Sequence, residues 1–236
     1  MKKVLIAILA VALVLGIAAC NTEHVMTYEE YAAAELDSEV TVEAYVQAHQ
    51  SWWDNKITVY AADKDGGYFF YNMQCSEADA AKLVPGTKIR VKGTKAEWSG
   101  EVEITDATFE IVKGNYIAEA TDVTSLLGTD DLAKKMNQFV SFNGLKIEAS
   151  KIEGEEQERA FLYNWDGSGE QGNDIYFKAS VNGNTYTFVI ESYLCGKDTE
   201  VYKAVEALKV GDTVDLEGFL YWYNGAQPHI TSVTVK

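Results

Sequence analysis

The stretch "GDTVDLEGFLYWYNG", residues 211–225, places three glycines seven residues apart and crowds three aromatic side chains against the last of them. The same spacing occurs in "GTKIRVKGTKAEWSG", residues 86–100. In the later copy, alternate residues from Val214 to Trp222 share one face of a predicted strand, and Gly218 falls in that inward row. A glycine weakens a flat strand but allows a strongly bent one, because no Cβ blocks a bulge. The spacing therefore predicts one bent strand in each half of the chain.

Aligning Gly86 with Gly211 also aligns the elements that precede each glycine frame. We predict helices at 27–36 and 76–83 with strands at 40–48, 56–62 and 68–73, and then helices at 130–136 and 199–208 with strands at 139–148, 175–181 and 184–191. Thr27 and Glu30 form a predicted capping box, and Asn182-Gly183 a hairpin turn. A final strand follows each frame, which is the element order of a five-stranded OB barrel.

The predicted fold is therefore mainly β: two tandem five-stranded OB-type barrels, each with a short helix before the first strand and one between strands three and four. The domains are placed at 27–114 and 115–236. Both halves, "PGTKIRVKG…WSGEVEITDATFEIV" and "VGDTVDLEG…YNGAQPHITSVTV", resemble bacterial extracytoplasmic OB-fold proteins. The resemblance implies the fold but leaves the ligand open, because this fold hosts many unrelated functions.

The first twenty residues, "MKKVLIAILAVALVLGIAAC", combine two lysines, an apolar stretch and small residues, as a signal peptide at 1–19 would. Residues 17–20 resemble the lipobox of bacterial lipoproteins. This resemblance implies a lipid on Cys20, a tether at 20–26, and a membrane-anchored protein on the extracytoplasmic face, at the cell surface. An uncleaved anchor helix and an ordinary secretory signal stay open as alternatives.

The chain carries 20 basic and 36 acidic residues and a net charge of −16. Because this charge repels phosphate backbones, we do not expect nucleic acid as a partner, and we expect a monomer. Cys75 and Cys195 occupy equivalent slots in the two halves. Such slots lie farther apart than the ~7 Å between Cα atoms that a disulfide allows, so two buried thiols are expected, with a bridge left open.

The predicted loops are unusually aromatic, and these aromatic residues are the candidate ligand-binding residues: Trp52, Trp53, Trp98, Trp165, Tyr221 and Tyr223. Exposed rings stack on sugar rings, on bases or on apolar side chains of a partner protein. The alternative is that they plug the ends of the barrels. Trp222 lies in the inward row and is expected in the core. Trp52 and Trp53 must face opposite ways if the strand continues.

One outward row of the first frame is basic: Lys88, Arg90 and Lys92. We expect this candidate interaction row to meet acidic surface on the other domain or on a partner protein. Two alternatives stay open. The row could be a solvated strand face, or with Trp98 it could track the backbone of a single-stranded nucleic acid.

Sequence signatures of catalysis are absent, since the chain has no G-x-S-x-G, H-E-x-x-H or C-x-x-C motif. We expect no enzyme activity, no metal site and no cofactor. The acidic connection at 150–174 loosely resembles a calcium loop but lacks the glycine and glutamate that such a loop needs, so we expect a solvated loop. The leading function is a binding module for a glycan, a cell-envelope polymer or a partner protein. The alternative is single-stranded nucleic-acid binding.

Overall fold

The computed structural model describes residues 24–236. The predicted signal peptide, the lipidation at Cys20 and most of the tether lie outside the described residues, so they stay predictions. Within residues 24–236, no helix has the length and apolar character needed to cross a membrane.

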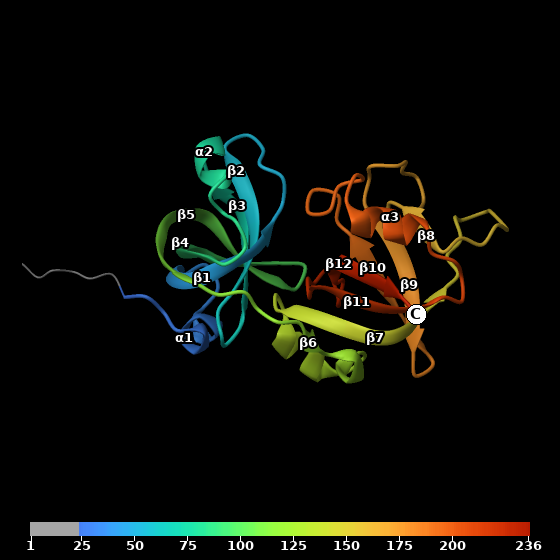
Figure 1. Ribbon diagram of the computed structural model, residues 1–236. Helices are drawn as coiled ribbons and strands as arrows, with labels where there is room; N and C mark the ends of the chain where they lie inside the picture. The colour runs from blue at the N-terminus through green and yellow to red at the C-terminus, as the bar shows by residue number, and fades with distance from the viewer. Residues whose placement is uncertain (1–23) are drawn as a thin grey trace, which may run out of the picture.

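The first barrel closes in the strand order β1-β2-β3-β5-β4 (Figure 1). Its strands are β1 (Glu39–His49), β2 (Lys56–Ala62), β3 (Gly67–Gln74), β4 (Thr87–Trp98) and β5 (Glu101–Asn115). Helix α1 (Tyr28–Ala33) precedes β1, and α2 (Glu77–Ala80) connects β3 to β4. The predicted capping box is present, because Thr27 and Glu30 bond each other's backbone N–H.

The second barrel repeats this order. Its strands are β7 (Phe139–Glu148), β9 (Ile175–Val181), β10 (Asn184–Ile190), β11 (Thr213–Phe219) and β12 (His229–Val235), with α3 (Glu200–Glu206) before β11. Because β7 pairs with both β9 and β11, the strands close as β7-β9-β10-β12-β11. The predicted fold of two tandem OB-type barrels is confirmed.

Four short elements differ from the sequence prediction. Three of them were not predicted, and the fourth, a 3-10 helix, overlaps the helix predicted at 130–136. These are β6 (Thr121–Asp122), β8 (Phe161–Tyr163) and the 3-10 helices η1 (Thr124–Leu126) and η2 (Asp130–Lys135). β6 pairs with β7, and β8 pairs with β9. They extend the second barrel's sheet, so the connection at 150–174 contains a strand rather than only loop.

The middle glycine of each frame lies where the register of its strand shifts. In β4 the pairing with β5 shifts between Lys92 and Thr94, around Gly93. In β11 the pairing with β12 shifts between Glu217 and Gly218. A Cβ on Gly218 would collide with the carbonyl oxygen of His229. The predicted bend therefore depends on a close approach of two backbones that only glycine permits.

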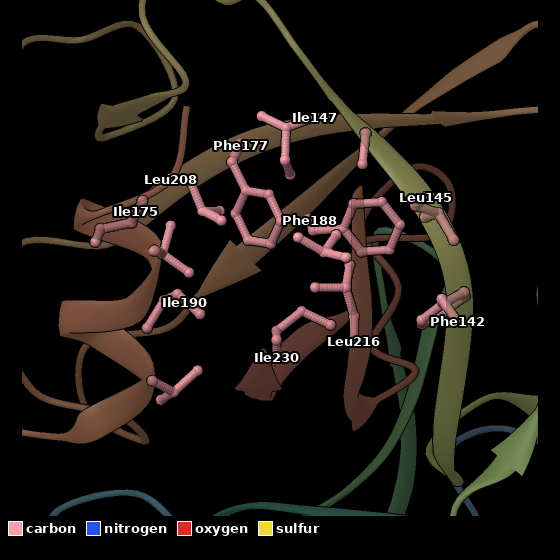
Figure 2. Packing of buried hydrophobic residues seen from close by; sticks show 14 of the residues in the cluster. Phe142, Leu145, Ile147, Ile175, Phe177, Phe188, Ile190, Leu208, Leu216 and Ile230 are labelled. Carbon is pink, nitrogen blue, oxygen red and sulfur yellow. The ribbon is translucent and has the colours of Figure 1, made fainter. Parts of the chain in front are cut away.

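Each barrel encloses its own apolar core, and Figure 2 shows that of the second, where Phe177 and Phe188 stack at 5.7 Å. A third, smaller cluster joins the barrels. It consists of Tyr60 and Phe69 from the first barrel and Phe219 from the second. Phe219 points away from its own core, as the alternation predicts, but it is buried because the first barrel covers it.

Cys75 and Cys195 are free and buried, so the expectation of two thiols is confirmed. Burial raises the pKa of Cys75 to about 11 and that of Cys195 to about 12. Both side chains therefore stay protonated at neutral pH.

Candidate functional site

A cavity of about 920 Å³ lies between the two barrels. Both barrels contribute to its lining, which is rich in aromatic side chains: Trp53, Phe69, Tyr71, Trp98, Trp165, Tyr176, Tyr193, Tyr221, Tyr223 and His229. Strands β2 and β3 form one side of the cavity, and the segments around β9, β10 and β12 form the other. We call it the inter-barrel cavity.

The structure brings together five of the six aromatic residues that were singled out from the sequence. Trp53, Trp98 and Trp165 line the inter-barrel cavity with 78%, 62% and 76% of their surface exposed. Tyr221 and Tyr223 also line it. Rings that are so exposed in a concave site are available for stacking on a ligand.

Trp52 is the exception among these six residues. Its indole N–H donates to the carbonyl oxygen of Cys75 at 2.8 Å, and its ring packs against the first core. Trp52 and Trp53 thus face opposite ways, although β1 ends at His49 and the strand on which that expectation depended does not reach them. Trp222 is half-buried and packs against the second core.

Five further aromatic residues of the cavity were not predicted: Phe69, Tyr71, Tyr176, Tyr193 and His229. A signal for Tyr176 exists in the sequence. It lies between the buried residues Ile175 and Phe177 on the second strand of its barrel, so it must face outward. That outward face belongs to the strands with which OB barrels bind their ligands.

The turn between β4 and β5 is held against the second barrel, and this contact places Trp98 in the same cavity as Tyr223. Asn224 donates its backbone N–H to the carbonyl oxygen of Ser99 at 2.7 Å. Trp222 packs over Gly100, where a Cβ would lie 2.8 Å from the indole. Ser99 and Gly100 both have positive φ, 52° and 91°, which makes the turn tight enough for this contact.

Trp53 is placed in the cavity by a similar tight turn. Trp53 and Lys56 exchange two backbone hydrogen bonds, of 3.0 and 2.8 Å. The two residues between them, Asp54 and Asn55, both have positive φ. Ahead of this turn, the backbone N–H of Ser51 donates to the carbonyl oxygen of Tyr193 in the second barrel at 2.8 Å. The loop that carries Trp53 is therefore fixed to both barrels.

The floor of the cavity contains a neutral histidine. His229 is buried and bonded through Nδ1 to the hydroxyl of Tyr60 at 2.7 Å. Tyr221 stacks on the same imidazole, with ring centroids 4.3 Å apart. Burial lowers the pKa of His229 to about 3, so at neutral pH the imidazole carries no charge.

Two carboxylates line the cavity, Glu191 and Asp174. Burial, and after it the negative charge of Asp174, raise the pKa of Glu191 to about 7. Glu191 accepts the backbone N–H of Leu194 at 2.7 Å, and Asp174 accepts both the N–H and the hydroxyl of Ser192. Among the described residues that line the cavity, Lys56 is the one lysine, and no arginine lines it.

The basic row lies away from this cavity; its acidic partners described below do not lie on the other domain, and a contact with a partner protein stays a prediction. Arg90 bonds Glu43 and Glu110 at 2.7 Å, Lys88 also bonds Glu43, and Lys92 pairs with Glu39 at 3.0 Å. These carboxylates belong to the same barrel, not to the other domain. The reason is register: Glu43 on β1 and Glu110 on β5 both lie directly opposite Arg90.

The connection at 150–174 contributes Trp165 and Asp174 to the cavity. Ser168 donates its backbone N–H to Asp166 at 2.9 Å, so these two residues of the loosely calcium-like stretch form a local turn. Across residues 24–236, no group of three or more His, Cys, Asp or Glu side chains is arranged to hold a metal ion.

No protein-family model and no curated protein matches the sequence. The chain is similar to the Ifi202 HINa domain in complex with 20-bp double-stranded DNA, with 13% identity over 84% of this chain and 98% of that one and a TM-score of 0.37. It is also similar to a murine DNA-binding protein bound to double-stranded DNA, with 13% identity over 83% of this chain and 97% of that one and a TM-score of 0.34. A third similar structure is a deletion mutant of the single-stranded DNA-binding protein from Thermus aquaticus, with 12% identity over 84% of this chain and 93% of that one and a TM-score of 0.26.

These structures correct one expectation, that nucleic acid is not a partner. That expectation rested on the net charge of −16 alone. The chains to which this one is similar include two bound to double-stranded DNA and a single-stranded DNA-binding protein.

Proposed function

We propose that the chain is a binding module, not an enzyme, and that its ligand lies in the inter-barrel cavity, held by aromatic stacking. The observation that carries this proposal is the convergence of Trp53, Trp98, Trp165 and Tyr223, which come from four separate segments of the chain. Large exposed rings are costly in solution unless they serve an interaction, and a concave, mostly aromatic site with a few polar groups is typical of ligand binding.

The ligand class that we favour is a glycan. The apolar faces of sugar rings stack on indole and phenol rings, while their hydroxyl groups need hydrogen-bond partners. The cavity offers such partners beside its rings, in the amides of Gln50, Asn72 and Gln227 and in the carboxylates of Asp174 and Glu191.

Single-stranded nucleic acid is the second candidate. Unpaired bases stack on exposed aromatic side chains without sequence preference, and three exposed tryptophans in one cavity suit them as well as they suit sugars. Lys56 could contact a phosphate. Bases and sugars would thus stack on the same tryptophans, but a nucleic acid carries a charged phosphate backbone and a neutral oligosaccharide carries no charge.

A binding screen of the full chain against neutral oligosaccharides and a mixed-sequence DNA single strand tests the proposal. We expect Trp53→Ala and Tyr223→Ala to weaken binding about tenfold or more each, since stacking contributes roughly 1–3 kcal/mol per ring. Ile117→Ala is the control, because Ile117 is exposed but does not line the cavity. Binding that survives both aromatic substitutions would contradict the proposed site.

Salt dependence separates the two ligand classes. Affinity for a single strand falls linearly with the logarithm of salt concentration, with a slope of about −0.7 per neutralised phosphate, because counterions are released. Stacking of a neutral sugar releases none. A steep slope would favour nucleic acid, and a flat one a glycan.

The lipid anchor at Cys20 is a separate proposal, supported by the sequence of residues 1–20. It would hold the barrels at the extracytoplasmic face of a membrane. Metabolic labelling with a fatty-acid analogue tests it: the wild-type chain should carry the label, and Cys20→Ser should not.

A further inference from the structure

The inter-barrel cavity combines stacking rings with an excess of negative charge. Asp174 and Glu191 lie among its aromatic side chains, and Lys56 is the only lysine or arginine among the described residues that line it. Neither carboxylate takes part in an ion pair within residues 24–236. Their hydrogen bonds come from backbone N–H groups, from the hydroxyl of Ser192 and, for Glu191, from the side chain of Gln50; these uncharged donors fix the carboxylates but do not neutralise them.

The groups around Glu191 leave its charge unbalanced. Asp174 adds a second negative charge, and Tyr60, Tyr176 and Cys195 are neutral groups on neighbouring elements. His229, which lines the same cavity from β12, is uncharged at neutral pH. Partial burial therefore places two carboxylates in a poorly hydrated site where Lys56 is the only lysine or arginine among the described lining residues and pairs with neither, and a cationic ligand group would stabilise their ionised forms.

A metal ion does not fit this arrangement well. Two carboxylates are fewer ligands than calcium or a transition metal requires, and the described residues form no group of three or more ligating side chains. Both side-chain hydrogen bonds of Asp174 end on Oδ1, which leaves Oδ2 for a donor from outside the chain. Exposed rings beside carboxylates are instead the chemistry that recognises an organic ammonium group, through cation–π contacts and charge-assisted hydrogen bonds.

We infer that the inter-barrel cavity recognises a saccharide that carries protonated amino groups, with its rings stacked on the tryptophans and its amines on Glu191 and Asp174. The inference rests on the proposed glycan-binding function and narrows it to one class of sugar. In this arrangement the aromatic side chains supply affinity for any ring of suitable shape. The two carboxylates supply the selectivity for a cationic one.

Three oligosaccharides of equal length with the same β-1,4-linked backbone test this inference on the full chain. They differ at C2 of each sugar, which carries a hydroxyl, an acetamido or an amino group. In neutral buffer we expect the amino form to bind about tenfold more tightly than the other two, a difference of about 1.4 kcal/mol. Equal binding of all three would overturn the inference while leaving the proposed function intact. Binding of none would contradict the glycan proposal itself.

Glu191→Gln tests the source of the selectivity. This substitution keeps the size of the side chain and an oxygen that can accept the N–H of Leu194, so we expect folding to persist and the preference for the amino form to fall to about threefold or less. Glu217→Gln is the matched control, since it removes the same charge from an exposed outward position on β11. An equal loss of preference in both variants would show a general effect of net charge and would overturn the assignment to Glu191.

Two further ligands exclude other kinds of partner. A linear polyamine offers amino groups without a ring, and it should bind at least tenfold more weakly than the amino oligosaccharide. A polyamine that binds as tightly would show recognition of charge alone, which contradicts the sugar assignment. A DNA single strand that binds where the amino oligosaccharide does not would move the site to the nucleic-acid candidate.

Discussion

The carboxylate of Glu101 in the first barrel accepts a hydrogen bond from the backbone N–H of Trp222 in the second barrel, at 2.8 Å. Glu101 is completely buried, and its other oxygen, Oε1, has no hydrogen-bond partner. Burial raises the pKa of Glu101 to about 8. The contact between the barrels therefore contains a carboxyl group that is most stable when it is protonated.

This arrangement predicts a dependence of stability on pH. Between the ordinary pKa of 4.5 and about 8, folded Glu101 keeps a proton that the unfolded chain has lost, so the free energy of unfolding falls as the pH rises through that window. Glu101→Gln keeps the hydrogen bond and never ionises. We expect this variant to be more stable than the wild type above pH 8 by a few kcal/mol, since one pKa unit corresponds to about 1.36 kcal/mol.

Urea unfolding at about pH 6 and about pH 9 measures the difference. Burial also raises the pKa values of Glu103 and Glu191 to about 7, so the wild type and Glu101→Gln should both lose some stability as the pH rises. The part specific to Glu101 is the gap between the two stabilities, which should widen from about pH 4.5 to about pH 8 and stay constant above it. Parallel curves would contradict a buried carboxyl group at this contact.

The bend in β11 predicts that Gly218 cannot be replaced. In Gly218→Ala the new methyl group meets the backbone of His229 and Ile230, which cannot move without opening the barrel. We expect a loss of roughly 3 kcal/mol or more in the free energy of unfolding, as for other severe overpacking. Gly196→Ala is the control, because its Cβ would lie 3.5 Å from the nearest atom, an ordinary contact. Similar stability of the two variants would contradict the close approach.

The hydrogen bond between Tyr60 and His229 predicts a coupling of the two barrels. Tyr60→Phe removes the hydroxyl and leaves a buried ring nitrogen without its partner, which costs roughly 1–3 kcal/mol. Thermal unfolding measures the loss, and hydrogen exchange should show it concentrated at β2 and β12. Tyr116→Phe is the control, because it also removes one tyrosine hydroxyl but from a ring that packs on Tyr45 within the first barrel. An equal effect of both substitutions would argue against a specific role for the bond.

The ion pairs of Arg90 predict a local effect only. Arg90→Glu would place three acidic side chains together on the first barrel, so we expect a small fall in melting temperature. Ligand affinity and the small-angle scattering profile should stay unchanged, because both acidic partners belong to the same barrel. A changed profile would show that the basic row contacts the other barrel after all.

The fold could be predicted because its strongest constraints are local in sequence. Glycine spacing and alternating apolar residues mark the bent strands, and Asn182-Gly183 marks a hairpin whose two residues both have positive φ. Strands as short as β6 and β8 leave no such pattern. They form because β7 and β9 pair with each other only at Lys146–Glu148, so the remaining parts of these two strands have edges to which β6 and β8 can bind, and this is a property of the assembled barrel.

The contact between the barrels was missed although a signal for it exists. Every residue of β2 after Lys56 is buried, and both faces of the first half of β3 are buried as well. Strands with two apolar faces are covered on both sides. Tyr60 and Phe69 therefore needed a second covering element beyond their own barrel, and Phe219 provides it.

The candidate site was predicted in its composition but not in its assembly. The sequence places Trp53, Trp98 and Tyr223 in loops. Their convergence depends on backbone contacts between distant segments, such as those from Ser51 to Tyr193 and from Asn224 to Ser99. Glu191 and Asp174 gave no signal as a pair, because only the closed barrel brings the two segments together.

Because the two barrels share the small cluster of Tyr60, Phe69 and Phe219, neither barrel can be separated from the other without exposing apolar surface. A chain cut within residues 116–120 would yield two fragments. The first would expose Tyr60 and Phe69, and the second would expose Phe219 and leave His229 without its hydrogen-bond partner, so each fragment carries the surface that covers the other. Such fragments should reassemble with the recognition pocket at their junction, which makes the cut molecule a natural starting point for a split reporter whose reconstitution responds to its ligand.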